Sequence, residues 1–281
     1  MDVLLNEDEE MIRDGVRRFF DAECSPDRVR GIEDGGARTD PELWRQLAEL
    51  GWLGLALPSV YGGGEAPFTQ LTVLFEEAGR ALAPVPLHPH VVTALALAEA
   101  VGRGECGPLA ATLVSEACVG DSLLTWAWSE RLPGMGPETI ELSATADGNG
   151  WRLNGHKGMV EAFEIAGHCL VAARTQTGGS ANGGLTLLLV APNAPGVSAV
   201  ARRTLAGDFQ SEVHFDNVYV DGDGLVGRVD EGWDLARPML QRAMVLNCAM
   251  IVGATRRAAE RAFDYAKERH AFGHPIGSFQ A

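Results

Sequence analysis

The feature of this sequence that most constrains its fold is a change in the spacing of its apolar residues at about residue 120. Before that point the spacing is helical. It is clearest at Leu43, Trp44 and Leu47, where Asp40 and Pro41 supply an N-cap and a first helical residue. After that point apolar and polar residues alternate in short segments, which predicts strands. We expect strands at residues 123–129, 139–146, 169–173, 185–191 and 212–220. Strands without intervening helices predict an antiparallel β domain rather than βαβ units.

Helical spacing occupies both ends of the chain. The first helix is expected to begin with a capping box made of Asn6 and Glu9, and after Glu231 the chain returns to helix. Further helices are expected at residues 67–82, 89–101, 107–118 and about 239–269. A single long helix cannot bury its apolar face without partners. From this order of helices, strands and a final long helix, the sequence predicts an α+β multidomain protein. Its parts are an N-terminal helical domain at residues 1–120, a central antiparallel β domain at 121–228 and the start of an incomplete C-terminal helical bundle at 229–281.

The composition is that of a globular chain with an acidic surface. With 281 residues, of which 46% are hydrophobic, the chain can bury a large core. A formal net charge of −15 repels phosphate backbones, so we expect no nucleic acid partner. No apolar run is long enough to span a membrane, and the acidic N-terminus does not resemble a secretory signal. The five cysteines are widely spaced, which is typical of reduced thiols rather than of a disulfide framework. We therefore expect a cytoplasmic protein.

Four motifs occur in an order and at a spacing that are typical of one protein family. They are the run from Trp44 to Leu55 with Pro58 and Tyr61-Gly62-Gly63, then Trp126-Ala127-Trp128-Ser129-Glu130, then the hairpin from Asp147 to Lys157, and finally Arg269, Phe272-Gly273-His274-Pro275-Ile276 and Phe279-Gln280-Ala281. On these motifs almost the whole chain resembles the acyl-CoA dehydrogenase family of flavoproteins. That family has a helical domain, a β domain and a C-terminal helical bundle, in agreement with the order that the spacing predicts.

The resemblance implies FAD as the cofactor and an acyl-CoA as the substrate. Members of the family remove hydrogens from the α and β carbons of the thioester, as in the degradation of fatty acids or steroids. By resemblance, the hydroxyl of Ser129 would hydrogen-bond the isoalloxazine and Trp126 would form an aromatic wall beside it. Arg269, Phe272 and Gln280 would reach the FAD of a neighbouring subunit. Without the resemblance, the two tryptophans of this strand would be core residues, and Arg269 would be a surface arginine favoured at a helix C-terminus.

Two departures from the family pattern affect the predicted chemistry. Met159 and Glu161 stand where members have an aromatic residue and a threonine near the flavin, and a carboxylate at that place would disfavour reduction of the flavin. The family's glutamate base lies in most members beyond the residues present here. In a minority it lies near the position of Gln241, which cannot accept a proton, and Glu231 would stretch the spacing. The catalytic base is therefore unknown. Arg242 resembles an arginine of one subgroup and fits an exposed helix arginine equally well.

Three hypotheses follow. The first is FAD-dependent α,β-dehydrogenation of an acyl-CoA by an oxidoreductase acting on CH–CH donors, with the base supplied by downstream sequence or a partner subunit. The second is a non-catalytic partner subunit of a heteromeric acyl-CoA dehydrogenase. The third is an acyl-CoA-binding scaffold without redox activity, since a fold does not imply a function. The resemblance also implies a homo- or hetero-tetramer and an electron-transfer flavoprotein or similar acceptor.

Two histidine patterns are interpreted without a functional role. His270 and His274 are four residues apart, but Gly273 and Pro275 interrupt the helix that would align them, so no metal site is expected. The tripeptide His88-Pro89-His90 is interpreted as a solvated turn.

Overall fold

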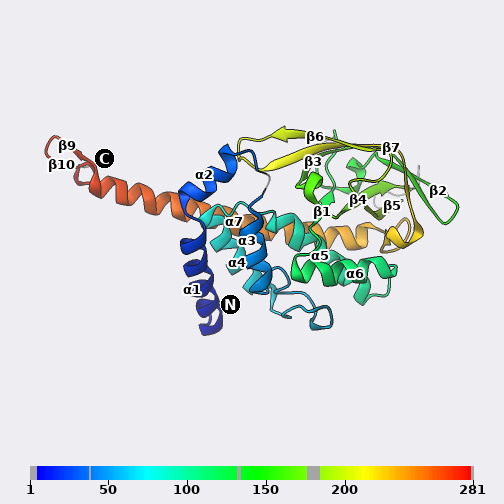
Figure 1. Ribbon diagram of the computed structural model, residues 1–281, viewed down its shortest axis with the longest axis horizontal. Helices are drawn as coiled ribbons and strands as arrows, with labels where there is room; N and C mark the ends of the chain where they lie inside the picture. Colours follow the sequence, from blue (N-terminus) through cyan, green and yellow to red (C-terminus); the bar gives the residue numbers. More distant parts are fainter. Residues whose placement is uncertain (1–4, 38, 132–133, 176–183, 280–281) are drawn as a thin grey trace. The chain divides into compact units, whose positions relative to one another are not determined.

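The structure is a computed structural model that describes residues 5–37, 39–131, 134–175 and 184–279 (Figure 1). The chain divides into two compact units. The first is formed by Met1–Gly31, Phe68–Pro84 and Val245–Ala281, and the second by Ile32–Pro67 and Val85–Met244. The three-domain boundaries expected from the sequence stay a prediction, and each unit is described by itself below.

The helices agree with the expected spacing at most positions. They are α1 (Glu7–Glu23), α2 (Pro26–Asp34), α3 (Pro41–Glu49), α4 (Phe68–Ala81), α5 (Leu87–Gly102), α6 (Pro108–Val119) and α7 (Trp233–Glu268). The capping box is present, because Glu9 N–H donates to Asn6 Oδ1 at 2.9 Å and Asn6 N–H donates to Glu9 Oε2 at 3.0 Å. Asp40 caps α3 through its carboxylate, which accepts from Leu43 N–H at 3.0 Å. Helix α2 was not expected from the sequence.

The second unit is built around a sheet (Figure 1). Its strands are β1 (Leu124–Ala127), β2 (Ser143–Asp147), β3 (Gly150–Glu161), β4 (His168–Arg174), β5 (Leu185–Val190), β6 (Val197–Arg203), β7 (Phe209–Val220) and β8 (Leu225–Val226), in the order β6-β7-β3-β2-β4-β5-β8 with β1 beside β4. The expected hairpin joins β2 to β3, with Asp147 opposite Gly150. The pairs β1–β4 and β2–β4 are parallel, so the sheet is mixed where the spacing predicted only antiparallel pairs.

One face of this sheet carries the hydrophobic core of the second unit. The buried residues include Leu153, Val171, Leu188, Val213 and Phe215. They alternate with more exposed residues along β3 and β7, as a half-buried antiparallel pair requires. Helices α5 and α6 pack together, and α5 also contacts β1. The core thus fixes the sheet to which the candidate site residues of β1 and β3 belong.

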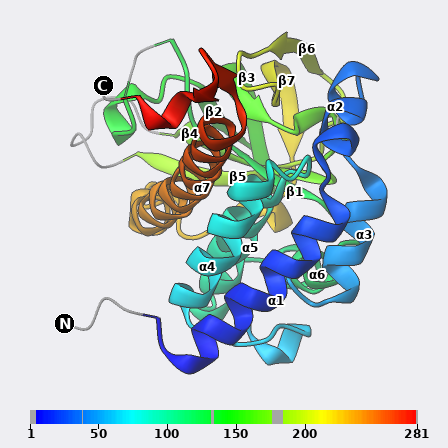
Figure 2. The same ribbon diagram turned by 90° about the vertical axis from the view of Figure 1, so that its left-hand side faces the viewer.

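The first unit contains α1, α4 and the part of α7 from Val245 onward. Figure 2 shows α1 and α4 side by side, and the two helices are in contact. Helices α4 and α7 approach through glycines. A Cβ at Gly79 would overlap the carbonyl oxygen of Met250, and a Cβ at Gly253 would overlap that of Glu76. The two backbones therefore meet without side chains between them at this crossing.

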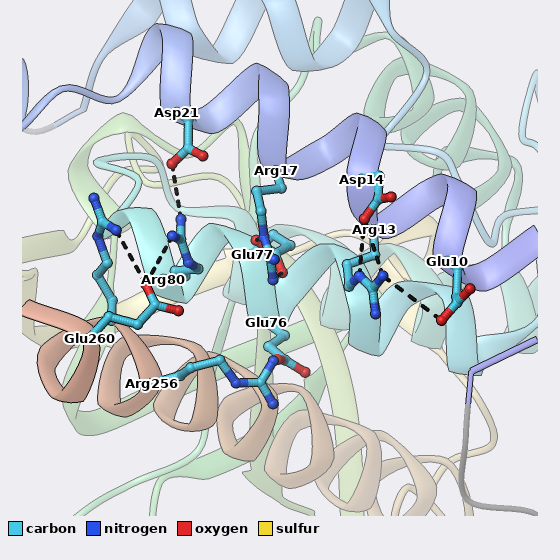
Figure 3. Close-up of polar contacts among 11 residues, drawn as sticks. Glu10, Arg13, Asp14, Arg17, Asp21, Glu76, Glu77, Arg80, Arg256 and Glu260 are labelled. Carbon is cyan, nitrogen blue, oxygen red and sulfur yellow. Dashed lines mark hydrogen bonds and ion pairs between the residues drawn. The ribbon is translucent and has the colours of Figure 1, made fainter. Parts of the chain in front are cut away.

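Ion pairs surround this crossing (Figure 3). Arg17 of α1 binds Glu77 of α4 through two bonds, Nε to Oε2 at 2.9 Å and Nη2 to Oε1 at 2.6 Å. Arg80 of α4 contacts Asp21 at 2.9 Å and Glu260 of α7 at 3.0 Å. The Glu77 side chain is 1% exposed, and a buried carboxylate of this kind requires its partner. The network therefore connects α4 to both neighbouring helices of its unit.

Candidate functional site

The expected site strand is short and leads out of the core. Strand β1 pairs with β4 in parallel, with Trp126 opposite Leu170. Trp126 is half-buried, Trp128 is buried, and Ser129 follows the strand with partial exposure. The Ser129 hydroxyl makes no hydrogen bond with any residue in the described ranges. Strand β1 and the residues that follow it thus present a half-buried aromatic side chain and a free hydroxyl close together in the sequence.

A buried ion pair holds the end of this strand. Lys157 of β3 donates from Nζ to Glu130 Oε1 at 2.6 Å and to the Trp128 carbonyl oxygen at 3.1 Å. The two side chains are 0% and 1% exposed. The Glu130 carboxylate also accepts from Glu141 N–H at 2.7 Å and from Leu142 N–H at 3.1 Å. Burial lowers the pKa of Lys157 to about 8, and the Glu130 carboxylate opposes that shift. Ser129 lies between these two fixed residues.

Strand β3 bends where it passes this site. The pairing of β3 with β7 shifts register between Lys157 and Val160, which marks a bulge. Gly158 N–H donates to the Ser129 carbonyl oxygen at 2.8 Å. Met159 has a left-handed φ of 56° and is 61% exposed. Since bulges redirect side chains, the bend places an exposed thioether next in sequence to the residue bonded to Ser129.

Two tryptophans pack beside the same segment. The rings of Trp128 and Trp233, at the start of α7, have centroids 5.8 Å apart. The indole Nε1 of Trp128 is buried and has no acceptor among the residues that the structure describes. A buried N–H without an acceptor costs about 1–3 kcal/mol, so this group is available to an acceptor from a ligand. No pattern in the sequence indicates the contact with Trp233.

The start of β1 is held by a histidine that the sequence interpretation placed wrongly. His90 is 0% exposed within α5, and His88 of the same helix is half-buried, so the tripeptide is no solvated turn. His90 Nδ1 accepts from Leu124 N–H at 3.2 Å, and Nε2 lies 3.1 Å from the carbonyl oxygen of Ala117. These partners require a neutral ring with the proton on Nε2. Burial lowers the pKa of His90 to about 4.

The other candidate residues belong to the first compact unit. The chain forms a hairpin of β9 (His270–Ala271) and β10 (His274–Pro275), joined by Phe272 and Gly273 with φ values of 52° and 82°. Two positive φ values are typical of a type I′ turn. Phe272 is 95% exposed at this turn, and Arg269 is exposed without an ion pair in the described part of the chain. Gln280 lies outside the described residues.

Neither Gln241 nor Glu231 has surroundings that identify it as a base, and the neighbouring Arg242 is ion-paired. Gln241 is exposed on α7. Arg242 donates to Glu99 of α5 at 2.5 Å, so it is ion-paired within its unit. Glu231 accepts from Arg228 at 2.7 Å on the surface. None of these contacts identifies a base, and the catalytic residues stay unknown.

The described residues contain no group of three or more histidine, cysteine, aspartate or glutamate side chains that could hold a metal ion. They also contain no helix that is long and apolar enough to cross a membrane, and the cytoplasmic location stays a prediction.

Comparisons with known proteins agree on one family. Residues 6–103 match the N-terminal domain of acyl-CoA dehydrogenase, residues 125–218 its middle domain, and residues 230–281 its C-terminal domain. The chain is 31% identical over 266 residues to acyl-CoA dehydrogenase FadE27 of Mycobacterium tuberculosis, covering 95% of this chain and 66% of that protein. The chain thus spans slightly less than two thirds of the length of this relative.

Two solved structures are similar over nearly the whole chain. A variant of the Tcur3481-Tcur3483 steroid ACAD is 33% identical with a TM-score of 0.83, covering 97% of this chain and 70% of that one. The ChsE4-ChsE5 complex from Mycobacterium tuberculosis is 28% identical with a TM-score of 0.86, covering 99% of this chain and 72% of that one. Together with the three matching domain models, these likenesses confirm the expected fold class of a helical, a β and a further helical part.

Proposed function

Because this chain belongs to the acyl-CoA dehydrogenase family, we propose that it forms part of an FAD-dependent oxidoreductase that acts on the CH–CH bond of an acyl-CoA thioester. The observation that carries the proposal is the end of β1. There the buried pair of Lys157 and Glu130 fixes the backbone on both sides of Ser129, and the Ser129 hydroxyl keeps its hydrogen-bonding capacity for a ligand.

The residues at this place fit a flavin. An isoalloxazine ring is planar, aromatic and edged by hydrogen-bond acceptors, so it requires apolar faces and a few donors. Trp126 offers an aromatic face, Ser129 a free hydroxyl, and Trp128 a buried N–H without an acceptor. In our proposal Ser129 orients the ring, Trp126 covers it and Lys157 keeps Ser129 in place. FAD, when bound, supplies the acceptor for the hydride that leaves the β-carbon.

The C-terminal hairpin supports a second contact with the cofactor. Phe272 occupies a left-handed conformation that costs a non-glycine residue about 1–3 kcal/mol, and yet its ring is almost fully exposed. Covering such a ring with another molecule is favourable, because it removes exposed apolar surface from water. We propose that Arg269 and Phe272 contact FAD held by a neighbouring subunit, the guanidinium at the pyrophosphate and the ring at an apolar edge. Gln280 is proposed beside them from the sequence alone.

A second function is favoured by one residue. The exposed side chain at position 241 is an amide, and Gln241 cannot take up the α-proton of a thioester. A heteromeric relative has been solved as the ChsE4-ChsE5 complex. The alternative is therefore a non-catalytic subunit of a heteromeric acyl-CoA dehydrogenase, with the base and most of the FAD site on its partner. In both cases we propose a homo- or hetero-tetramer, a fatty acyl-CoA or steroid acyl-CoA substrate, and an electron-transfer flavoprotein or similar acceptor.

The decisive experiment measures FAD binding by the chain with and without its neighbouring subunit. We expect the Ser129→Ala variant to bind FAD about 5- to 10-fold more weakly than the wild type, because one hydrogen bond of about 1 kcal/mol is lost. The matched control is Ser198→Ala, which removes an exposed hydroxyl on β6 and should leave the affinity unchanged. Bleaching of the bound flavin by an acyl-CoA panel then identifies the substrate class. Retention of no FAD in any assembly would refute the proposal, while FAD binding only in the presence of the partner supports the alternative.

A further inference from the structure

Three polar side chains meet on one face of the sheet where β3 ends. Glu161, the last residue of β3, is the direct cross-strand partner of Gln210 on β7. Direct partners in an antiparallel pair have Cβ atoms about 5 Å apart on the same face. Asp208 precedes Gln210 by two residues, and Gln210 Nε2 donates to Asp208 Oδ2 at 2.6 Å. Glu161 therefore lies beside an amide that is already bonded to a second carboxylate.

The orientation of the Gln210 amide leaves an acceptor without a donor. Because Nε2 is bonded to Asp208, Oε1 must point elsewhere. Gln210 Oε1 is buried and has no donor among the described residues. A carboxylate at Glu161 could only accept hydrogen bonds, whereas a protonated carboxyl could donate one. A proton on Glu161 would thus supply the donor that Gln210 lacks.

The charges around Glu161 also favour a proton. Asp208 accepts hydrogen bonds from Thr204 and Gln210 and forms no ion pair in the described ranges, so no cation offsets this carboxyl next to Glu161. The carboxyl of Glu33 approaches Gly207 on the same loop. Burial, followed by the Asp208 charge, raises the pKa of Glu161 to about 7.

The arginine opposite Gln210 on the neighbouring strand is paired with another carboxylate. Arg202 of β6 is the cross-strand partner of Gln210, but it is paired with Glu212. Glu164, in the turn after β3, is exposed. No lysine, arginine or histidine of the described part forms a salt bridge with Glu161. A cation that would keep this carboxyl ionised is therefore not in place.

Glu161 is connected to the proposed cofactor site through β1. Thr125 Oγ1 donates to the Glu161 carbonyl oxygen at 2.6 Å, and Thr125 is next to Trp126. Strand β3 also carries Lys157, which fixes Ser129. The carboxyl and the proposed flavin-binding hydroxyl are thus placed by the same two strands.

We propose that Glu161 binds a proton in the cofactor site and donates it in a hydrogen bond to Gln210. When negative charge is added to the bound cofactor, Glu161 becomes more fully protonated. This inference rests on the proposed FAD site for its second half only. A neutral carboxyl removes the repulsion that an ionised one would exert on a reduced flavin. Added negative charge raises the proton affinity of a neighbouring carboxyl, so the proton is drawn from solvent as the flavin accepts electrons.

The first test uses the chain without FAD. Carboxyl ¹³C signals of glutamate-labelled protein are followed by NMR from pH 4 to 9. We expect one signal, absent in Glu161→Gln, to titrate near pH 7. In Asp208→Asn its midpoint should fall by about one pH unit, because the neighbouring charge is gone. The control Glu164→Gln should leave the midpoint unchanged. Titration of Glu161 at an ordinary glutamate pH, or an unshifted midpoint in Asp208→Asn, would overturn the shared proton.

The second test uses the complex that binds FAD. Spectroelectrochemistry measures the flavin midpoint potential from pH 5.5 to 8.5 in the wild type and in Glu161→Gln, whose amide can still donate to Gln210 but cannot titrate. We expect the potential of the wild type to depend more steeply on pH near neutrality. Identical pH dependence in both proteins would overturn the coupling. Failure of the chain to bind FAD in any assembly would instead refute the proposed function, and the titration without FAD would still decide the shared proton.

Discussion

Acidification should destabilise the second compact unit through His90. This histidine is fully buried, and its ring must be neutral because Nδ1 accepts a hydrogen bond from Leu124 N–H. Its pKa falls from an ordinary 6.5 to about 4, and the cause is burial, opposed by the carbonyl oxygen of Ala117. Protonation of Nδ1 would convert that acceptor into a donor that faces another donor.

The sign and size of the effect follow from this pKa. Between pH 6.5 and 4 the unfolded chain binds a proton at His90 that the folded chain does not bind. The free energy of unfolding should therefore fall as the pH is lowered through this window, by about 1.4 kcal/mol per pH unit and about 3 kcal/mol in total. Below pH 4 this contribution should not change further.

The assay compares urea unfolding of the wild type with that of His90→Asn at pH 7.5, 5.5 and 4.5. Asparagine places an acceptor oxygen near the position of Nδ1 but does not titrate. It cannot replace the contact of Nε2 with the Ala117 carbonyl oxygen, so the variant should be less stable than the wild type at pH 7.5 by about 1–3 kcal/mol. The difference should shrink as the pH falls. His88 and His168, whose pKa values are also lowered by burial, contribute equally to both proteins. Parallel pH dependence of the two proteins would refute the assignment of a neutral, hydrogen-bonded His90.

Two further predictions concern an ion pair of the second compact unit and a helix crossing of the first. Lys157→Met should cost about 3–5 kcal/mol in chemical unfolding, because it leaves the buried Glu130 carboxylate without its cation. Adding Glu130→Gln should recover part of that loss, and no recovery would contradict the ion pair. Gly253→Ala should lower the melting temperature, since the new methyl group overlaps the Glu76 carbonyl oxygen and such overpacking costs about 1–3 kcal/mol. Gly15→Ala, in open space on α1, should raise stability by about 0.5–1 kcal/mol. If Gly253→Ala were stabilising as well, that result would contradict the close helix crossing.

Local signals in the sequence were sufficient for much of the fold. The capping box at Asn6, the cap at Asp40 and the hairpin at Asp147 depend on residues within a few positions of one another, and all three are present. Helix α2 was missed because it has no buried residue and hence no clear apolar face. Strand β6 was missed for a related reason, since it is an edge strand whose residues are largely exposed.

Features that depend on distant partners were not predictable from spacing. The parallel pairing of β1 with β4 joins residues more than forty positions apart, for example Leu124 and His168. The tripeptide containing His90 resembles a polar turn, but Pro89 lies in the first turn of α5, where its missing N–H costs nothing. Ser129 was identified only by the family resemblance. Neither its support by Lys157 nor the partner of that lysine could be inferred from apolar periodicity.

These distant contacts explain how so short a strand can present a binding residue. Strand β1 has four residues, and strands of this length are marginal by themselves. Both of its ends are held by buried polar side chains, His90 at Leu124 N–H and Lys157 at the Trp128 carbonyl oxygen. A hydrogen bond fixes direction as well as distance, whereas apolar packing alone would allow the strand end to shift. Loss of either anchor should therefore weaken ligand binding at Ser129 even under conditions in which the chain remains folded.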